Sequence, residues 1–361
     1  MNIIITSPSL DPRQNVSGIS SVTKFIIDNN PKHQYIHFEL GKKDKEKGGM
    51  RRVLALWRRY GAWKRLLAEE PEAWVHYNFP LSKASLLRDP WFLRYALRQG
   101  RKVVVHVHGG QFLTAPKIPF YLRRIMRWVF RQDVPFIVLS ELERDILTQR
   151  FGAKRVFSLP NCVDLHDARA FAEAGRGRDE TQPLRIGYLG RIEPNKGMTE
   201  LLAAVRRLKQ AGCPFQLVLA GKEQTEGEYL PWFEQALADH FHYAGLVAGT
   251  TKCDFLRSLD AFILPTYFEG LPMSLLECMS YGAAPVVTPV GSIPQVVQNG
   301  VNGLMIKDHD VDSIVEAVLR LDGDRRLLRT LGDAARQTIF ERFSPQQYVE
   351  KLNHIYADLA R

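Results

Sequence analysis

The chain has 361 residues, of which 45% are hydrophobic and 24% charged, as in an average soluble protein with about two domains. Lysine and arginine number 49 against 39 aspartates and glutamates, a surplus of +10 that favours an anionic partner: nucleic acid, membrane lipid or a phosphate-bearing ligand. No stretch approaches the ~18 consecutive apolar residues of a membrane span, and residues 1–10 lack the pattern of a signal peptide, so we expect a cytoplasmic protein. The four cysteines form neither a CxxC metal pair nor a disulfide framework, which predicts reduced thiols and no zinc site.

Short apolar runs alternate with amphipathic stretches along the whole chain, the pattern of βαβ units that build parallel sheets. In the first half, strands are expected at 2–6, 34–39, 73–77, 103–108 and 136–140. In the second half, they are expected at 184–190, 215–221, 240–245, 261–265, 284–288 and 303–306. Helices should fill the gaps, so the fold class is α/β with two Rossmann-like, doubly wound domains.

A polar stretch without a sustained apolar period separates the two halves. It predicts a first domain at 1–164, a linker at 165–183 and a second domain at 184–343. Residues 344–361 predict a final helix that starts with Ser344 as N-cap and returns to the first domain. Its apolar stripe consists of Tyr348, Leu352, Ile355 and Leu359.

Ligands bind at the carboxyl ends of parallel strands, so the segments that follow strands carry the chemistry. The most informative segment runs from 266 to 306 and begins TYFEGLPMSLLE. Glu269 lies in a loop, a helix starts near Pro272, and Glu277 lies on that helix. Carboxylates hold sugar or ribose hydroxyls, while N–H groups at a helix N-terminus favour phosphate oxygens. A nucleotide sugar carries both hydroxyls and phosphates, so its site needs both kinds of group.

EGLPMSLLE, with Glu269 and Glu277 in E-x7-E spacing, resembles the signature of the retaining glycosyltransferases of family 4, which have the GT-B fold. The later VGSIPQVVQNGVNGLMI is similar to a second stretch of that family, with Gln295 where the family usually has Glu. An ordinary loop and helix would explain E-x7-E alone, but not the whole segment. The resemblance implies two domains facing across a cleft, the first binding acceptor and the second binding donor.

The resemblance also implies roles for the residues of this segment. Glu269 would hold the hydroxyls of the donor sugar and Glu277 the ribose. The backbone near the loop and helix start would contact sugar or phosphate, through Gly270, Leu271, Pro272 and Met273. The nucleotide base would lie near the strand end that contains Leu246 and Val247.

The segment GYLGRIEPNKG follows the first strand of the second half and brings Gly190, Arg191 and Lys196 to one strand end. It is neither a Walker A loop nor a GxGxxG motif. Taken alone, the two cations fit a solvated loop better than a site. In the family that the chain resembles, the matching Arg and Lys bind the donor diphosphate, so the resemblance assigns Arg191 and Lys196 that role.

Candidate residues in the first half lie after the strands at 2–6 and 103–108. His108 and Gly109 stand at a strand tip, and a lone histidine there is more often structural, as we expect for His106. In family 4 a His-Gly pair at this place faces the transferred sugar, so the resemblance gives His108 that role. Ser17 and Gly18 match the family's first glycine loop, near donor phosphate and acceptor, with Ser for its first Gly.

Asn161 lies in SLPNCVD, which resembles the family's PNGVD stretch with Cys162 in place of Gly; it either contacts ligand or closes a turn. Aspartate pairs at 308–312 and 322–324 are the only DxD patterns, and Asp310 and Asp312 fit an N-cap and first-turn position better than a metal site. We expect no metal and no cofactor, since Arg191, Lys196 and a helix N-terminus can neutralise a diphosphate.

Positive charge concentrates in the first half, at 41–65 and at 119–132. The second segment interleaves arginines with Trp and Phe, and such a basic amphipathic helix can lie in the headgroup plane of an anionic membrane. A solvated helix face over a core would give the same pattern, and both alternatives stay open. Membrane binding would place the protein at the inner face of the cytoplasmic membrane. No RRM, KH or helix-turn-helix signature accompanies the charge, so no nucleic acid is expected.

These expectations describe a metal-independent, retaining glycosyltransferase that moves a hexose-type sugar from a nucleotide diphosphate donor to a bacterial cell-surface polysaccharide, glycolipid or lipid-linked glycan. Two alternatives remain. One is a sugar-nucleotide epimerase or a phosphorylase on the same fold, and the other is a non-catalytic GT-B scaffold. The base, the sugar, the acceptor and the linkage depend on pocket shape and do not follow from the sequence.

Overall fold

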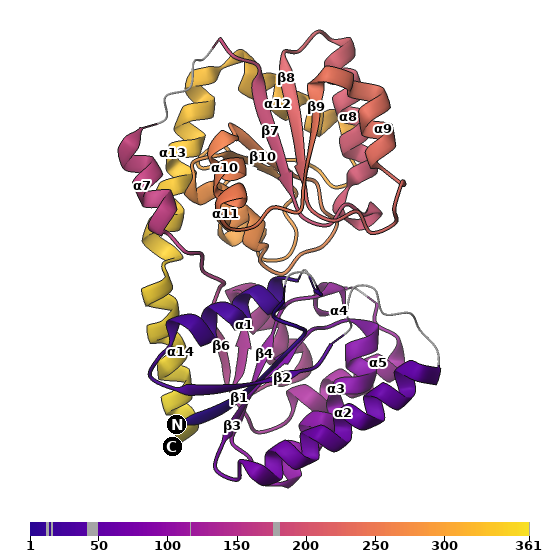
Figure 1. Ribbon diagram of the computed structural model, residues 1–361, viewed down its shortest axis with the longest axis vertical. Coiled ribbons are helices and arrows are strands. Elements are labelled where there is room, and N and C mark those ends of the chain that lie inside the picture. The colour runs from indigo at the N-terminus through magenta and orange to yellow at the C-terminus, as the bar shows by residue number, and fades with distance from the viewer. Residues whose placement is uncertain (12–13, 16, 42–49, 116, 176–180, 361) are drawn as a thin grey trace. The chain divides into compact units, whose positions relative to one another are not determined.

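The computed structural model describes residues 1–11, 14–15, 17–41, 50–115, 117–175 and 181–360 (Figure 1). The chain forms two compact units. Unit 1 comprises Met1–Asn161 together with Gln346–Arg361, and unit 2 comprises Cys162–Pro345. Within the described ranges, no helix is long and apolar enough to cross a membrane.

Unit 1 is built on a parallel sheet of six strands in the order β2-β1-β3-β4-β5-β6. The strands are β1 (Asn2–Ser7), β2 (Gln34–Glu39), β3 (Trp74–Phe79), β4 (Val103–Val107), β5 (Phe136–Val138) and β6 (Val156–Ser158). The helical segments are α1 (Gly18–Asn29), α2 (Met50–Glu69), α3 (Lys83–Arg98), α4 (Gln111–Thr114), α5 (Phe120–Phe130), α6 (Glu141–Ile146), η1 (Leu147–Phe151) and α14 (Pro345–Ala360). The central strands are buried on both faces, as a sheet covered on both sides requires.

Unit 2 has a second parallel sheet of six strands, in the order β12-β11-β10-β7-β8-β9. The strands are β7 (Leu184–Leu189), β8 (Phe215–Ala220), β9 (Phe241–Gly245), β10 (Ala261–Leu264), β11 (Ala284–Val287) and β12 (Leu304–Met305). The helical segments are α7 (His166–Ala174), η2 (Pro194–Lys196), α8 (Met198–Gln210), α9 (Leu230–Leu237), η3 (Ala238–His240), α10 (Gly249–Ser258), α11 (Met273–Ser280), η4 (Ile293–Gln295), α12 (Val311–Gly323) and α13 (Arg325–Arg342). The α/β class and the pair of Rossmann-like sheets are confirmed.

Two elements differ from the sequence-based expectation. Strand β6 was not predicted, because it has only three residues, all partly buried at the edge of the sheet. The expected linker 165–183 contains helix α7, whose Ala168 is buried and whose Phe171 ring lies 5.7 Å from that of Tyr281. One alanine and one phenylalanine give too weak a periodicity to signal a helix. Residues 176–180 of that expected linker lie outside the described part of the chain.

The two ends of the polypeptide meet in unit 1. Tyr348, Leu352 and Ile355 of α14 are buried, as the predicted stripe requires. The ring of Tyr348 packs edge-on against Phe25 of α1, with centroids 5.6 Å apart. Near the end of α14, the Asp358 carboxylate pairs with Arg155 Nη2 at 2.6 Å.

The basic helix at 119–132 does not present its apolar stripe to solvent. In α5, Leu122, Met126, Val129 and Phe130 are fully buried in the core of unit 1. The apolar stripe therefore packs on the core of unit 1, so a membrane contact of this helix would involve its exposed residues instead. Of the other basic segment, 41–65, residues 42–49 lie outside the described ranges.

Candidate functional site

Two of the functional residues predicted for unit 2 meet where its strand order reverses. Strand β10 pairs directly with β7, whereas the chain first runs from β7 to β8 and β9 on the opposite side. Open α/β sheets bind ligands at such a switch point. Lys196 follows β7 and Glu269 follows β10, so the topology brings the two segments together although they are 73 residues apart.

Lys196 and Glu269 form an ion pair at this point. Lys196 Nζ lies 2.6 Å from Glu269 Oε1, and their side chains are only 18% and 15% exposed. The ammonium also lies 6.0 Å from the centre of the Phe268 ring. Partial burial makes such a pair stronger than a surface pair and holds both side chains in place before any ligand arrives.

Backbone contacts lock the two loops that carry this pair. The N–H of Tyr267 donates to the Asn195 carbonyl at 3.1 Å. Gly197 has φ +72°, and a Cβ there would lie 2.0 Å from the Pro265 carbonyl oxygen. Only glycine permits this conformation and this approach. Gly291 also permits a close approach, since a Cβ there would lie 2.0 Å from the Glu269 carbonyl oxygen.

Glu277 has a partner that the sequence did not reveal. Lys252 Nζ of α10 donates to Glu277 Oε1 of α11 at 2.8 Å. Burial alone would lower the pKa of Lys252, but the Glu277 carboxylate outweighs it and raises that pKa, so the lysine stays charged. Leu246 and Val247, where the base contacts are expected, lie just before α10, the helix that carries Lys252. No motif or spacing singled out Lys252.

Arg191 and Gly190 lie at the end of β7. The hydroxyl of Tyr188 donates to the Arg191 carbonyl, and the N–H of Gly190 donates to the Ala220 carbonyl at 3.0 Å. Burial raises the pKa of Tyr188 well above its usual value, so this hydroxyl remains a donor. The Arg191 side chain is exposed. At the start of α11, Leu271 and Pro272 are buried and Gly270 accepts from the Ser292 N–H at 2.9 Å.

In unit 1 His108 follows β4 and is held by Asn78 of β3. The Asn78 amide nitrogen donates to the Thr6 carbonyl at 2.7 Å and to Thr23 Oγ1 at 2.9 Å. A carbonyl only accepts, so the oxygen Oδ1 of Asn78 must face His108 Nε2, at 2.6 Å. His108 Nε2 therefore carries the proton and donates it to Asn78.

Burial, and secondarily the nearby His76, lowers the pKa of His108 to about 3. The imidazole is thus neutral at physiological pH, and its Nδ1 keeps a lone pair. His108 can accept a hydrogen bond from a hydroxyl but cannot donate one from Nδ1. Sequence reasoning missed Asn78, which lies 30 residues away on the neighbouring strand.

His106 belongs to a buried polar chain rather than to an exposed strand tip. His76 Nε2 lies 3.1 Å from His106 Nδ1, and His76 Nδ1 lies 2.7 Å from the hydroxyl of Tyr356 in α14. The His106 ring stacks on that of His108, with centroids 4.1 Å apart. Burial lowers the pKa of His106 well below its usual value, as it lowers that of His108, so the two stacked rings are neutral and need no counter-charge.

The remaining predicted residues of unit 1 are Ser17, Gly18, Gly109 and Asn161. Ser17 is the N-cap of α1 and its Oγ accepts from the Ser20 N–H at 3.3 Å. A Cβ at Gly18 would meet nothing within 4 Å, so packing does not require glycine there. Gly109 has φ +68°, and Asn161 is buried at the end of the first segment of unit 1.

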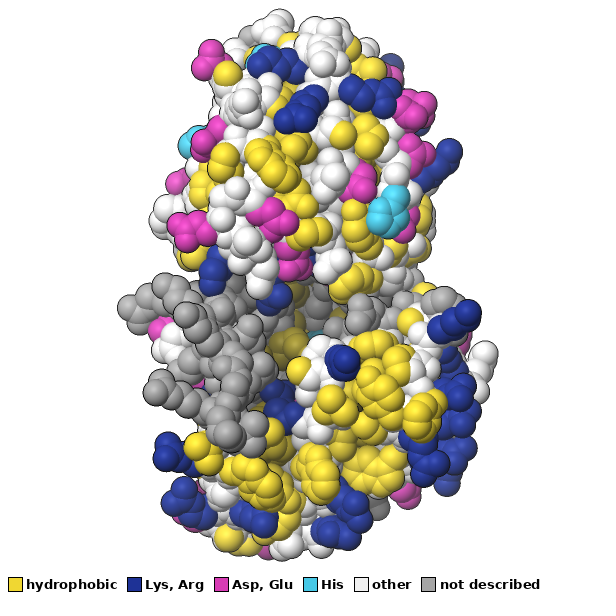
Figure 2. Space-filling view, turned by 90° about the vertical axis from the view of Figure 1, so that its right-hand side faces the viewer, with side chains coloured by type: hydrophobic (Ala, Val, Ile, Leu, Met, Phe, Trp, Pro, Cys, Tyr) yellow, Lys and Arg dark blue, Asp and Glu magenta, His cyan; other side chains and the backbone are white. Residues whose placement is uncertain are grey.

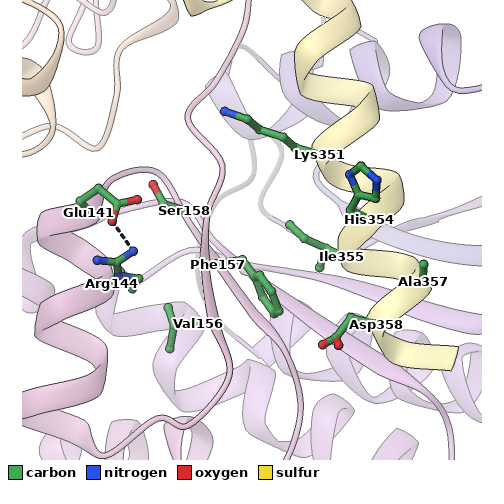
Figure 3. A pocket seen from close by; sticks show the side chains of 10 residues that line it. All are labelled: Glu141, Arg144, Val156, Phe157, Ser158, Lys351, His354, Ile355, Ala357 and Asp358. Carbon is green, nitrogen blue, oxygen red and sulfur yellow. Dashed lines mark ion pairs between the residues drawn. The ribbon is translucent and has the colours of Figure 1, made fainter. Parts of the chain in front are cut away.

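A cavity of about 580 Å³ lies elsewhere in unit 1, between α6, β6 and α14 (Figure 3). Lys351 and His354 reach it from α14, and Glu141 and Arg144 form an ion pair on its opposite wall. None of the predicted site residues lines it. This cavity is therefore separate from the predicted site residues.

The aspartate pairs act as caps. Asp310 is the N-cap of α12 and accepts from the Ser313 N–H at 3.2 Å, and Asp312 is in the first turn, as predicted. Asp324 caps α13, and Asp322 pairs with Arg325. Among the described residues, no group of three or more His, Cys, Asp or Glu could hold a metal ion.

Comparison with known proteins places this geometry in a family. Residues 32–167 match the family described as Glycosyltransferase Family 4, and residues 183–324 match Glycosyl transferases group 1. The first match falls mainly in unit 1 and the second in unit 2. The chain belongs to glycosyltransferase family 4. Its paired Rossmann-like sheets are the GT-B fold of that family.

Relatives of this family 4 protein are distant. It is 26% identical over 236 residues to a glycogen synthase of Mycobacterium tuberculosis, covering 63% of this chain and 55% of the relative. It is 26% identical over 171 residues to the capsular polysaccharide biosynthesis glycosyltransferase CapM of Staphylococcus aureus, covering 47% and 45%. The matches thus span about half the length of these relatives.

Among solved structures, HepE of Anabaena in complex with UDP-glucose superposes with a TM-score of 0.74. The superposition covers 99% of this chain and 100% of HepE, at 15% sequence identity. At that identity the similarity establishes the fold alone.

Proposed function

We propose that this protein is a retaining glycosyltransferase that moves a hexose-type sugar from a nucleoside diphosphate donor to a polysaccharide, glycolipid or lipid-linked glycan. The observation that carries the proposal is the half-buried Lys196–Glu269 pair at the β7/β10 switch point. It puts one cation and one carboxylate where a sugar diphosphate needs both.

The donor roles that the family resemblance implies are compatible with the two ion pairs. Glu269 holds sugar hydroxyls, and Glu277, with Oε1 fixed by Lys252, offers its second oxygen to the ribose. Lys196 and Arg191 lie at one strand end, where they stabilise negative charge on the departing diphosphate. These cations and the start of α11 supply the positive charge, so we propose that the reaction proceeds without a metal ion.

In the transfer step, an acceptor hydroxyl oxygen forms a bond to the anomeric carbon while the bond from that carbon to the diphosphate oxygen breaks. The electron pair of the broken bond goes to the diphosphate, which takes the hydroxyl proton. Attack and departure on the same face retain the anomeric configuration. His108 Nδ1 accepts from a hydroxyl of the transferred sugar, which fixes its orientation.

The names of the related proteins support the proposed substrate classes. HepE was solved with UDP-glucose, so UDP is the first nucleotide to test. The names of the two relatives refer to glycogen and to capsular polysaccharide, which supports a glycan acceptor.

A thermal-shift screen of the full chain against UDP, GDP, ADP and their sugars tests the donor. One nucleoside diphosphate should raise Tm, because ligand at about 100 times its Kd stabilises a fold by about 2.7 kcal/mol. A flat response to all of them would contradict the donor site. Product analysis then separates the alternatives: a transferase releases nucleotide only with a glycan acceptor, whereas an epimerase or phosphorylase needs no such acceptor.

Asn78→Asp is expected to create a pH dependence that the natural protein lacks. With its pKa near 3, His108 stays neutral from pH 5 to 9. A carboxylate at position 78 favours the imidazolium and raises that pKa, so Nδ1 becomes protonated as the pH falls. We expect kcat/KM of the variant to fall about tenfold more than that of the natural protein between pH 8 and pH 5.

Thr23→Val is the matched control for this variant. It removes one partner of the Asn78 amide but adds no charge, and the Thr6 carbonyl still fixes the amide. Its pH profile should follow the natural one. Identical profiles for Asn78→Asp and the natural protein, with both folded by circular dichroism, would show that Asn78 does not set the protonation of His108.

A further inference from the structure

The outer face of α2, α3 and α5 carries a surface that the proposed reaction does not use. The helices are neighbours in unit 1, α3 contacting both α2 and α5 (Figure 1). Six of the eight large hydrophobic residues exposed in the described part of unit 1 lie on them. They are Leu54, Trp57, Leu87, Trp91, Phe120 and Tyr121. We call this set the aromatic face.

The aromatic face is not the rim of the core. Trp57, Trp91 and Phe120 are 68%, 64% and 70% exposed, whereas the inward sides of the same helices bury Trp63, Phe92 and Met126 completely. Figure 2 shows a broad hydrophobic area on the lower body, bordered by lysine and arginine. A contiguous apolar area of this kind on a folded domain marks an interaction site.

Exposed cations border the aromatic face. They include Arg58 on α2, Arg94 and Arg98 on α3, and Arg123 and Arg124 on α5. None of these five has an ion-pair partner among the described residues. The three helices contain two acids, Glu69 and Asp89. Asp89 is fully buried and pairs with Arg88, so it does not offset the surface charge.

We propose that the aromatic face binds the surface of a bilayer that contains anionic lipid. Trp and Tyr favour the headgroup level of a membrane, and Arg side chains around them attract anionic headgroups. A nucleic acid would leave the leucines and the phenylalanine without apolar contact.

This surface includes parts of both segments that the sequence suggested, 41–65 on α2 and 119–132 on α5. The apolar stripe of α5 is buried, and α3, which the sequence did not single out, supplies Trp91 and Leu87. The proposal goes beyond the proposed function and does not depend on it. If both hold, membrane binding brings the enzyme to lipid-linked acceptors.

The test is sedimentation of the full chain with vesicles of phosphatidylcholine alone and of phosphatidylcholine mixed with phosphatidylglycerol. We expect binding to the anionic vesicles that weakens as salt rises. The triple variant Trp57→Ser, Trp91→Ser and Phe120→Ser should bind at least about tenfold more weakly. The pair Arg94→Glu and Arg123→Glu should lose a similar factor for anionic vesicles.

Trp232→Ser is the matched control, since Trp232 is an exposed tryptophan on α9 of unit 2. Its vesicle binding should not change. The nucleotide-induced rise in Tm should persist in the triple variant, so loss of the aromatic face and loss of the donor site give different readouts. Vesicle binding by the triple variant equal to that of the natural protein would overturn the proposal. A dimer of the natural protein that the triple substitution dissociates would also overturn the proposal, because the aromatic face would then bind a second copy of the chain.

Discussion

Lys196→Ala is expected to lower kcat by about 100- to 1000-fold while the protein stays folded. The lysine stabilises charge that develops on the leaving diphosphate, and the loss of one such preorganised group costs about this factor. Its effect should fall on kcat more than on KM, because the charge is greatest in the transition state. Lys196→Arg should recover part of the rate by retaining the charge. Steady-state kinetics with the identified donor measures both.

Lys196 contacts Glu269 in the structure. The Lys196→Ala variant therefore needs a control that separates a role in positioning Glu269 from a direct role at the diphosphate. If the lysine acts only by positioning Glu269, then Lys196→Ala added to Glu269→Gln should cost nothing more. If it acts on the diphosphate, the double variant should be slower than Glu269→Gln alone. Arg206→Ala removes an exposed cation from α8 and should leave kcat unchanged. Unaltered kcat in Lys196→Ala would contradict the proposed mechanism.

Glu277→Ala is expected to lower kcat/KM for the donor by roughly 10- to 100-fold, mainly through KM. The carboxylate is the proposed partner of the ribose, and a hydrogen bond to a charged group contributes about 1.5–3 kcal/mol. This interaction is the same in the ground and transition states, so kcat should change less. The nucleotide-induced thermal shift should shrink in parallel.

Glu234→Ala is the matched control, an exposed glutamate on α9 of the same unit. Lys252→Ala tests the positioning role: it frees Glu277 Oε1 without removing the carboxylate, so donor KM should rise less than in Glu277→Ala. A Glu277→Ala variant with the natural KM and thermal shift would remove Glu277 from the donor site.

The family and the fold class could be read from contiguous sequence. The strand at 261–264 and the loop and helix that carry Glu269 and Glu277 are consecutive, so their apolar runs and spacing are visible without the structure. Where the signal was short, prediction failed: β6 has three residues and α7 buries one alanine. The burial of the apolar stripe of α5 did not follow from the sequence, because an apolar stripe looks the same whether it faces a sheet or a membrane.

The sequence alone determined the α/β architecture, the family 4 signature and the two carboxylates, because each depends on residues close together in the chain. Only the tertiary structure decided the partners: Lys196 for Glu269, Lys252 for Glu277, and Asn78 for His108. These contacts join segments 73, 25 and 30 residues apart. The first and third exist because strand order places particular strand ends side by side, and the second joins helices α10 and α11. No local pattern encodes these arrangements. The aromatic face was also decided only by the tertiary structure, because the packing of three helices determines which tryptophans remain exposed.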